Sequence, residues 1–406
     1  MRAPRPLRRA GALLAALTLP LATLTGLAPS AHAADPALER VTGFGSNPGA
    51  LTMYRHLPDD LPAGAPVVLV LHGCGQSAAE YAGASGWLGD AGTSGFALVA
   101  AQQETGNNAS RCFNWFEPGD TSRGRGEALS LRQMVAHTVA AVDADPDRVF
   151  VAGFSGGGAM ASSVLAAYPD VFAGGAVLAG VPHGCATSMI GAFSCMNPGV
   201  TKSAERWGDL VRAENPGYDG PWPSVAVWHG SADSTVRPGN ATESVKQWTD
   251  VHGTDATPDG STTLPGNVTR TTYDGPAGVA VRHYTASGMG HAVPVRPGEG
   301  CGTSGTYFAD VLCSTSTITA DWGIGDGPSD PGDPGDPGDP GDPGDPGTPE
   351  CVTASNYAHS TAGRASVRYG YAYAVGSGDA LGLWNIYTLT SLTETRPGWY
   401  ERTAGC

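Results

Sequence analysis

The fold of this chain is decided by residues 149–160, which read VFVAGFSGGGAM. Four apolar residues that favour strands lead into the pattern Gly153-x-Ser155-x-Gly157, and a helix-like apolar pattern follows. Strand, sharp turn and helix in this order predict a nucleophile elbow, in which a serine hydroxyl stands exposed at the end of a buried strand. The glycines fit because a side chain at either position would crowd the adjoining strand and helix. The alternative is a tight turn with an incidental serine.

The alternation of strands and helices extends over residues 34–325. Continuous apolar runs predict strands buried on both sheet faces at residues 67–71, 96–101, 149–152, 175–179, 225–228 and 279–284. Apolar positions at helical spacing predict a helix over residues 127–142. The pattern favours an α/β fold, with a mostly parallel sheet and helices on both faces. Residues 183–224 read as irregular and are interpreted as a cap or insertion near the site.

Three loops at predicted strand ends carry Ser155, Asp233 and His291, in the chain order typical of α/β-hydrolases. A serine hydroxyl is a weak nucleophile until a base takes its proton, and an imidazole accepts and returns a proton near neutrality. A neighbouring aspartate orients the imidazole and stabilises the imidazolium. We therefore predict Ser155 as nucleophile, His291 as base and Asp233 as the orienting acid of a serine hydrolase.

Other histidines compete for the role of base. His183 is the main rival, whereas His229 and His283 lie at predicted strand ends and are interpreted as structural. His72 directly follows a predicted strand, and we interpret it as a residue that holds the next loop rather than as the base.

That loop begins at His72 and continues as Gly73-Cys74-Gly75-Gln76. In hydrolases of this architecture, the loop after an early strand supplies one amide of the oxyanion hole. The flanking glycines let the backbone of Cys74 approach a developing oxyanion. We predict that the backbone N–H groups of Cys74 and Gly156 form the oxyanion hole.

Aromatic residues gather in the polar loop at residues 111–116 and in the region of residues 183–224. Phe113, Trp115 and Trp222 are predicted to line a groove for the acyl chain or polymer. The alternative is that the loop aromatics simply pack beneath a long loop.

The N-terminal residues 1–33 predict a signal peptide. Four arginines precede an apolar run that polar residues interrupt, and Ala31-His32-Ala33 offers a small-x-small cleavage site. Removing these arginines lowers the formal net charge of the 406-residue chain from −15 to −19. The strong negative charge of the mature protein argues against nucleic acid and anionic membrane partners. No stretch after residue 33 is apolar enough to span a bilayer. We expect a secreted, extracellular monomer.

The eight cysteines fit an oxidising compartment. Spacing leaves their connectivity open, but it suggests the local pairs Cys74–Cys112, Cys185–Cys195, Cys301–Cys313 and Cys351–Cys406. The sequence has no Cys-x-x-Cys motif and no His/Cys cluster with zinc spacing. We therefore expect disulfides, and neither a metal nor another cofactor.

The C-terminal part divides into a linker at residues 326–350 and a small module at residues 351–406. The linker repeats Asp-Pro-Gly six times over residues 330–347, a composition typical of an extended, solvated tether. The module is rich in aromatic residues that suit adsorption to a solid polymer, and alternatively supply its small core. Its predicted substrate-binding residues are Tyr371, Trp384 and Trp399. A tethered module would raise the enzyme concentration at an insoluble substrate.

Taken together, these motifs resemble the extracellular poly(3-hydroxybutyrate) depolymerases, an esterase group that includes feruloyl and acetylxylan esterases. The resemblance rests on residues 72–76, 112–116, 153–157, 229–233 and 290–292, and in the tail on residues 351–359, 362–365 and 382–385. It implies an α/β-hydrolase domain, a polyester-binding tail and hydrolysis of insoluble short-chain polyester through an acyl-enzyme. The alternative is a feruloyl or acetylxylan esterase acting on plant polysaccharide. The Asp-Pro-Gly linker departs from the threonine-rich or fibronectin-like linkers of the family.

Overall fold

The computed structural model describes residues 38–325, 351–361, 364–368, 371–383, 388–396 and 399–403. The predicted signal peptide and linker lie outside these residues. Among the described residues, no helix is both long and apolar enough to cross a bilayer.

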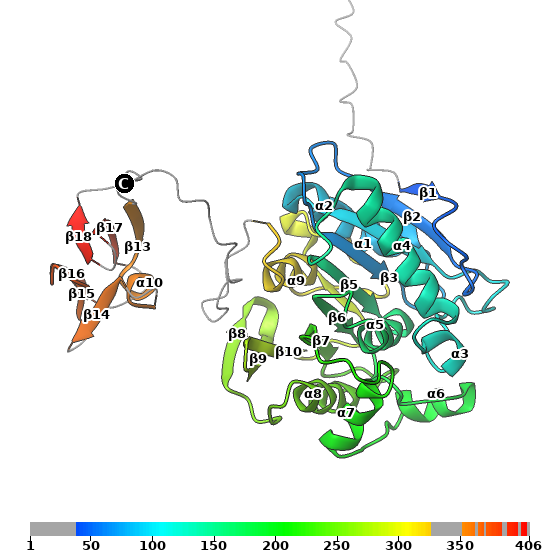
Figure 1. Cartoon of the computed structure of the whole chain (residues 1–406). Coiled ribbons are helices and arrows are strands. Elements are labelled where there is room, and N and C mark those ends of the chain that lie inside the picture. The colour runs from blue at the N-terminus through cyan, green and yellow to red at the C-terminus, as the bar shows by residue number, and fades with distance from the viewer. Residues whose placement is uncertain are drawn as a thin grey trace, which may run out of the picture. The chain divides into compact units, whose positions relative to one another are not determined.

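A ten-stranded sheet forms the centre of residues 38–325, with the order β1-β2-β4-β3-β5-β6-β7-β10-β9-β8 (Figure 1). Six neighbouring strands run parallel: β4 (Ala97–Gln102), β3 (Val67–Leu71), β5 (Val149–Phe154), β6 (Gly174–Leu178), β7 (Ser224–Gly230) and β10 (Gly278–Ala286). They confirm the six strands predicted from apolar runs. Antiparallel strands extend both edges: β1 (Glu39–Val41) and β2 (Thr52–His56) at one, β9 (Val268–Gly275) and β8 (Gly260–Leu264) at the other.

Alternate side chains of each central strand enter two apolar cores, one on each face of the sheet. In β3, Leu69 and Leu71 belong to one core, and Val68 and Val70 to the other. The first core is covered by α4 (Gly126–Val142), α5 (Gly156–Ala167), α7 (Ala204–Arg212) and α8 (Gly239–Val251). The second is covered by α1 (Ala78–Ala84), α2 (Trp87–Ser94) and α9 (Ser314–Asp321). This arrangement is an α/β-hydrolase fold, as predicted.

The order of the strands places two loops next to each other at the carboxyl edge. The chain passes from β3 to β4 on one side, and then returns to β5 on the other side of β3. Such a switch of direction is where open α/β sheets hold their ligands. Because Leu71 pairs with Gly153, the loop after β3 adjoins the turn after β5.

Residues 183–224 contain two helices, so the prediction of an irregular segment was wrong. They are α6 (Met189–Met196) and α7, and each begins at a serine whose hydroxyl accepts a backbone N–H. The remaining short elements are α3 (Pro118–Thr121), the 3₁₀ turns η1 (Pro265–Asn267) and η2 (Pro297–Glu299), and the paired strands β11 (Val293–Val295) and β12 (Phe308–Asp310).

Three of the four suggested disulfides are confirmed: Cys74–Cys112, Cys185–Cys195 and Cys301–Cys313. Cys351 is also disulfide-bonded, but its suggested partner Cys406 lies outside the described residues.

The C-terminal module contains two three-stranded antiparallel sheets and one helix. One sheet has the order β13 (Cys351–Ser355), β17 (Leu389–Arg396), β18 (Trp399–Thr403), and the other β14 (Ala365–Arg368), β15 (Tyr371–Ala374), β16 (Ala380–Leu383). Its apolar core is small and mainly alanine and leucine. At the start of α10 (Asn356–Thr361), the buried Asn356 donates to the carbonyls of Leu381 and Leu383 and accepts from Thr390. Polar contacts therefore supplement the small core.

Candidate active site

Ser155 occupies the turn between β5 and α5 with a φ of 55° and a ψ of −117°. A non-glycine residue rarely adopts such a positive φ, and residues held in strained conformations cluster at active sites. A Cβ at Gly157 would contact the carbonyl oxygen of Leu71, and one at Gly153 would contact the carbonyl oxygen of Gly157. The close approach of strand, turn and helix therefore requires glycine at both positions, as predicted.

The structure brings Ser155, His291 and Asp233 into one hydrogen-bonded chain. His291 Nδ1 lies 2.7 Å from Asp233 Oδ2, and His291 Nε2 lies 2.9 Å from Ser155 Oγ. A carboxylate only accepts, so Nδ1–H donates to Asp233. That leaves Nε2 to accept from the Ser155 hydroxyl, which is the arrangement a general base requires.

Asp233 and His291 meet because their strands are neighbours. β7 pairs with β10 in parallel, so the loops after both strands leave the same edge of the sheet. The backbone N–H of Ala232 donates to the carbonyl of Met289, and the N–H of Gly288 donates to Ser231 Oγ. These hydrogen bonds hold the two loops together.

The Asp233 carboxylate is buried and hydrogen-bonded on both oxygens. Oδ1 accepts from the backbone N–H groups of Thr235 and Val236 at 2.8 and 2.9 Å. Burial alone disfavours the charge, but hydrogen bonds from His229 and His291 hold the pKa of Asp233 well below its usual value. Asp233 is therefore ionised at neutral pH and able to orient His291.

The other histidines have different partners. His229 Nε2 donates to the carbonyl of Val236 at 2.9 Å and lies 3.4 Å from Asp233, which supports its structural interpretation. Burial lowers the pKa of His283 to about 4. His183 faces Ser163 at 3.1 Å and Glu214 at 3.4 Å, so both ring nitrogens are engaged away from Ser155. Among the described residues, no group of three or more His, Cys, Asp or Glu side chains is placed to hold a metal ion.

Two backbone amides beside Ser155 are available for an oxyanion. Gly156 is the first residue of α5, and Cys74 lies in the loop after β3. No described residue accepts a hydrogen bond from either N–H group. A Cβ at Gly156 would lie 2.9 Å from Cys74 Sγ, so the two residues are neighbours. Their N–H groups can serve the role predicted for them, since free donors at a helix start favour negative charge.

His72 supports the loop that carries Cys74. Its Nδ1–H donates to the carbonyl of Gly73 at 2.8 Å, and its Nε2 accepts from the backbone N–H of Gln103 at 3.1 Å. The ring is fully buried, and burial lowers the pKa of His72 to about 4. A neutral His72 therefore ties the loop to the end of β4, in agreement with its predicted role.

This buried histidine should make stability depend on pH. The unfolded chain protonates His72 near pH 6.5 and the folded chain only near pH 4, so its contribution to stability is complete above pH 6.5 and is lost as the pH falls toward 4. The lowered pKa corresponds to about 3 kcal/mol of unfolding free energy. Urea denaturation at pH 7 and at pH 4 measures how far the unfolding free energy falls between the two. We expect this fall to be smaller in His72→Gln than in the parent, by about the same amount. An equal fall in both proteins would contradict this expectation.

The predicted aromatic groove is only partly supported. Phe113 is fully buried, and its ring centroid lies 5.0 Å from that of His72, so its assignment to a substrate groove was wrong. It packs beneath the loop instead. Trp115 has little exposed surface, but its Nε1 would lie 3.8 Å from a Cβ at Gly156. Its predicted contact with substrate stays a prediction.

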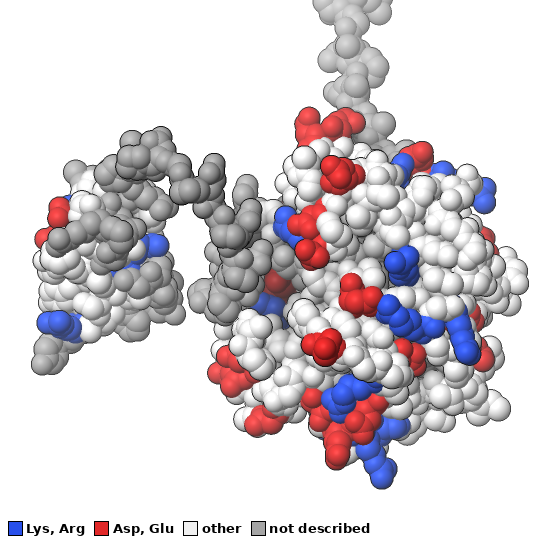
Figure 2. All heavy atoms as spheres, viewed as in Figure 1, with Lys and Arg blue, Asp and Glu red and all other residues white. Residues whose placement is uncertain are grey.

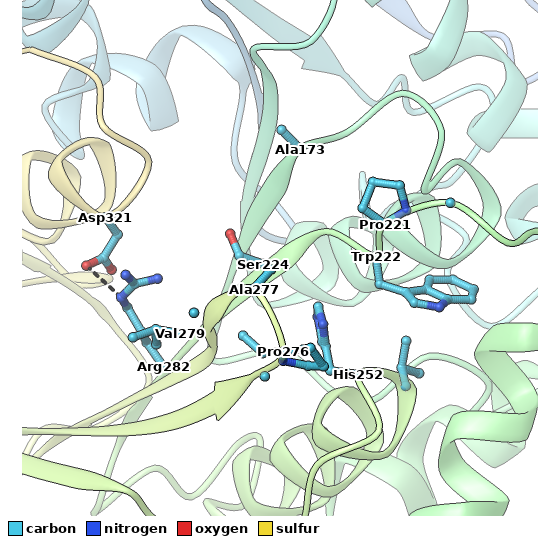
Figure 3. Close-up of a pocket in the computed structure, with 15 residues that line it drawn as sticks. Ala173, Pro221, Trp222, Ser224, His252, Pro276, Ala277, Val279, Arg282 and Asp321 are labelled. Atoms are coloured by element: carbon cyan, nitrogen blue, oxygen red, sulfur yellow. Dashed lines mark ion pairs between the residues drawn. The ribbon is translucent and has the colours of Figure 1, made fainter. Parts of the chain in front are cut away.

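Trp222 was wrongly assigned to the substrate site. It precedes β7, whereas Asp233 follows the same strand, so the two residues lie at opposite ends of the sheet. Figure 3 shows Trp222 at a cavity of about 390 Å³, together with Ser224, His252 and Pro276. This cavity is separate from the candidate triad.

In the C-terminal module, the exposed Tyr371 of β15 lies opposite the exposed Leu383 on the neighbouring strand β16. Trp399 is half-buried, since its ring packs over Gly376. Trp384 lies outside the described residues.

Two further residues near the site, Glu127 and Tyr307, carry no signal in the sequence. Glu127 is buried in the first turn of α4, where it accepts from the backbone N–H of Asn114 at 2.8 Å and from the side chains of Gln103 and Asn107. It thereby anchors the loop that carries Trp115. Tyr307 is exposed, and its ring centroid lies 6.5 Å from that of His291. Neither residue belongs to a local motif that would have revealed its role.

The chain is similar to known esterases. Residues 54–263 match the family model described as Esterase PHB depolymerase. The chain is 50% identical over 292 residues to poly(3-hydroxyalkanoate) depolymerase C of Paucimonas lemoignei, covering 71% of this chain and 70% of the relative. It is 36% identical over 262 residues to feruloyl esterase B of Thermothelomyces thermophilus, covering 63% and 88%. The solved acetyl xylan esterase from Aspergillus awamori superposes with a TM-score of 0.59 at 29% identity, covering 65% and 97%.

Proposed function

This chain belongs to the Esterase PHB depolymerase family and is a carboxylic ester hydrolase, and from that premise we propose that it hydrolyses the ester bonds of poly(3-hydroxybutyrate) and related short-chain polyhydroxyalkanoates. The observation that carries the chemistry is the hydrogen-bonded chain from Ser155 through His291 to Asp233. The substrate class is supported by the 50% identity to a poly(3-hydroxyalkanoate) depolymerase, against 36% for the feruloyl esterase.

In the proposed mechanism, Ser155 Oγ attacks the ester carbonyl while His291 Nε2 takes the hydroxyl proton. The carbonyl oxygen becomes an oxyanion, which the N–H groups of Cys74 and Gly156 stabilise. The loss of one such donor typically costs about 3 kcal/mol of transition-state stabilisation. His291 then passes the proton to the departing alkoxide, which leaves as the hydroxyl end of a polymer fragment. Water, deprotonated by His291, hydrolyses the acyl-enzyme and restores Ser155.

We further propose that the chain is secreted and acts on the solid polymer through its C-terminal module. Three disulfides within residues 38–325 fit an oxidising compartment, and residues 1–33 have the pattern of a signal peptide. In the module, the exposed cross-strand pair of Tyr371 and Leu383 offers an apolar surface. Residues 34–325 are the proposed catalytic domain, residues 326–350 the tether and residues 351–406 the polyester-binding module.

A chain that ends at Gly325 should separate adsorption from chemistry. Its initial rate on dissolved p-nitrophenyl butyrate should match that of the full chain, because the candidate triad lies within residues 38–325. Its clearance of poly(3-hydroxybutyrate) particles should fall by about 100-fold, since a tethered module raises the effective concentration at the surface. Turbidity measures the clearance. The double variant Tyr371→Ser/Leu383→Ser in the full chain removes only the exposed apolar pair of the module, and it should also slow the clearance of particles. Equal clearance by all three proteins would contradict the proposed role of the module.

The second candidate function is that of a feruloyl or acetylxylan esterase on plant polysaccharide, which the superposed acetyl xylan esterase favours. Parallel assays of the full chain on poly(3-hydroxybutyrate) particles, methyl ferulate and acetylated xylan distinguish the two. Release of soluble hydroxybutyrate, with little ferulate or acetate, supports the polyester depolymerase. Release of ferulate or acetate without clearance of the particles would overturn it.

A further inference from the structure

Large exposed apolar side chains of the catalytic part are few, and they lie on one helix and next to His291. Within residues 38–325, four such side chains are exposed: Met189, Ile190, Phe193 and Tyr307. The first three lie on α6, and Tyr307 borders His291. Single exposed apolar residues are ordinary on protein surfaces, but a cluster beside a site marks a surface for interaction.

The three side chains of α6, which we call the α6 patch, share one face of a firmly anchored helix. Met189, Ile190 and Phe193 are 55%, 83% and 65% exposed. The opposite face buries Ala192 and Cys195, and Cys195 is bonded to Cys185 just before the helix. Its apolar face is therefore presented to solvent by a rigid element rather than by a frayed end.

The α6 patch is close to the loop that carries Asp233. The N–H of Asn197 donates to the carbonyl of Phe193, so the two residues are one helical turn, about 5.4 Å, apart. The side chain of Asn197 donates to the carbonyl of Ser234, the residue after Asp233, at 3.1 Å. Arg237, in the same loop, donates its backbone N–H to the carbonyl of Met196. These hydrogen bonds tie the C-terminal end of α6 to the loop that carries Asp233.

Charged side chains are sparse around the α6 patch; one of them is the exposed Arg237, whose Nε donates to Asn197 Oδ1 at 3.3 Å, just after the end of the helix. In an otherwise strongly acidic chain, residues 171–201 contain no Asp, Glu, Lys or Arg. The surface over α6, at the lower right in Figure 2, is largely free of coloured atoms. An aliphatic polyester is uncharged and offers alkyl groups and ester carbonyls, so it is chemically complementary to this face.

We propose that the α6 patch is a second polyester-adsorbing surface, which seats the catalytic domain on the polymer next to Ser155. This proposal rests on the proposed function. The C-terminal module would bring the chain to the particle, and the patch would keep the candidate site against the surface. A strand of polymer that enters the site would then lie over apolar side chains rather than water.

The test replaces the patch in the full chain, as M189S/I190S/F193S, with M189L/I190L/F193L as the matched apolar control. Depletion from the supernatant measures adsorption to poly(3-hydroxybutyrate) particles, and turbidity gives the clearance rate for each adsorbed molecule. We expect the serine variant to hydrolyse p-nitrophenyl butyrate within twofold of the parent and to clear particles about tenfold more slowly for each adsorbed molecule. The leucine variant should clear them at nearly the parental rate. Ile190→Lys is a second test. Ile190 is 83% exposed, so this replacement should leave the fold intact while it slows the clearance for each adsorbed molecule.

Several outcomes would overturn the proposal. One is parental clearance for each adsorbed molecule by both the serine variant and Ile190→Lys. Another is equal loss in the leucine variant, which would point to specific contacts rather than apolar adsorption. A third is a parent that sediments as a dimer and becomes a monomer when the patch is changed, because the patch would then join two subunits. If the parent hydrolyses the soluble ester but clears no particles, the proposed function itself is wrong, whatever the variants do.

Discussion

Replacing Ser155 with alanine is expected to abolish ester hydrolysis, with a loss of about a million-fold in kcat, as is typical when such a nucleophile is removed. The hydroxyl is the only part of the side chain that reaches His291 Nε2, at 2.9 Å. Without it, His291 and Asp233 keep their contact but have no nucleophile to activate. Initial rates on p-nitrophenyl butyrate and the clearance of polyester particles measure the loss.

The fold of Ser155→Ala should be unchanged, because alanine adds no atom to the crowded turn between Gly153 and Gly157. Urea denaturation of the variant beside the parent is the control. A variant with the parental free energy of unfolding that keeps more than about one hundredth of the activity would contradict the assignment, because loss of the nucleophile costs far more than that.

Replacing His291 with alanine should reduce activity to a similar extent, because the residues of a triad act as one unit. His291 bridges the other two residues, and no other described histidine contacts Ser155. His183→Gln is the matched control, since this buried histidine hydrogen-bonds with Ser163 and faces Glu214 instead. We expect His183→Gln to retain activity on the soluble ester within a few-fold.

The two histidine variants together discriminate between the rival bases. Retained hydrolysis in His291→Ala with loss in a correctly folded His183→Gln would reverse the assignment. Near-ultraviolet circular dichroism of both variants shows whether the tertiary packing is intact.

The same activity assays with Asp233→Asn should give an intermediate loss, about 10⁴-fold, because the orienting carboxylate acts through His291.

The fold was largely predictable because its strongest signals are local. The strands β3, β4 and β5 are nearly continuous apolar runs, a pattern typical of strands that are buried on both faces. The order of Ser155, Asp233 and His291 was visible because Ser155 directly follows a strand and the other two lie in loops that begin at strand ends. Parallel strands place their carboxyl ends at one edge of the sheet. The glycines around Ser155 were informative because sterics allow no other residue there.

Other features had no local signal. The edge strands β8 and β9 are polar and rich in threonine, so they lack the apolar pattern of the centre. The helix α6 contains a glycine and exposes most of its large apolar residues, so its pattern does not resemble that of an amphipathic helix packed on a core. The anchoring role of Glu127 depends on partners from 13 to 24 residues away, which only the folded chain brings together.

The two wrong aromatic assignments have separate causes. Phe113 lies in a polar loop, but this loop folds back so that the ring packs against His72 in the interior. Trp222 is close to Asp233 in sequence. It lies at the opposite end of β7 from Asp233, however, because it precedes the strand that Asp233 follows. Composition indicates that an aromatic side chain needs burial or a partner. It does not indicate at which end of a sheet that partner is found.

Ser155 is the proposed nucleophile for polyester hydrolysis. The most direct measurement is stoichiometric labelling of the full chain with an uncharged alkyl p-nitrophenyl phosphonate, followed by peptide mass spectrometry. We predict one label for each chain, on the peptide that contains Ser155, and a loss of particle clearance in proportion to the labelled fraction. Complete labelling of Ser155 with clearance of poly(3-hydroxybutyrate) particles undiminished would contradict this prediction.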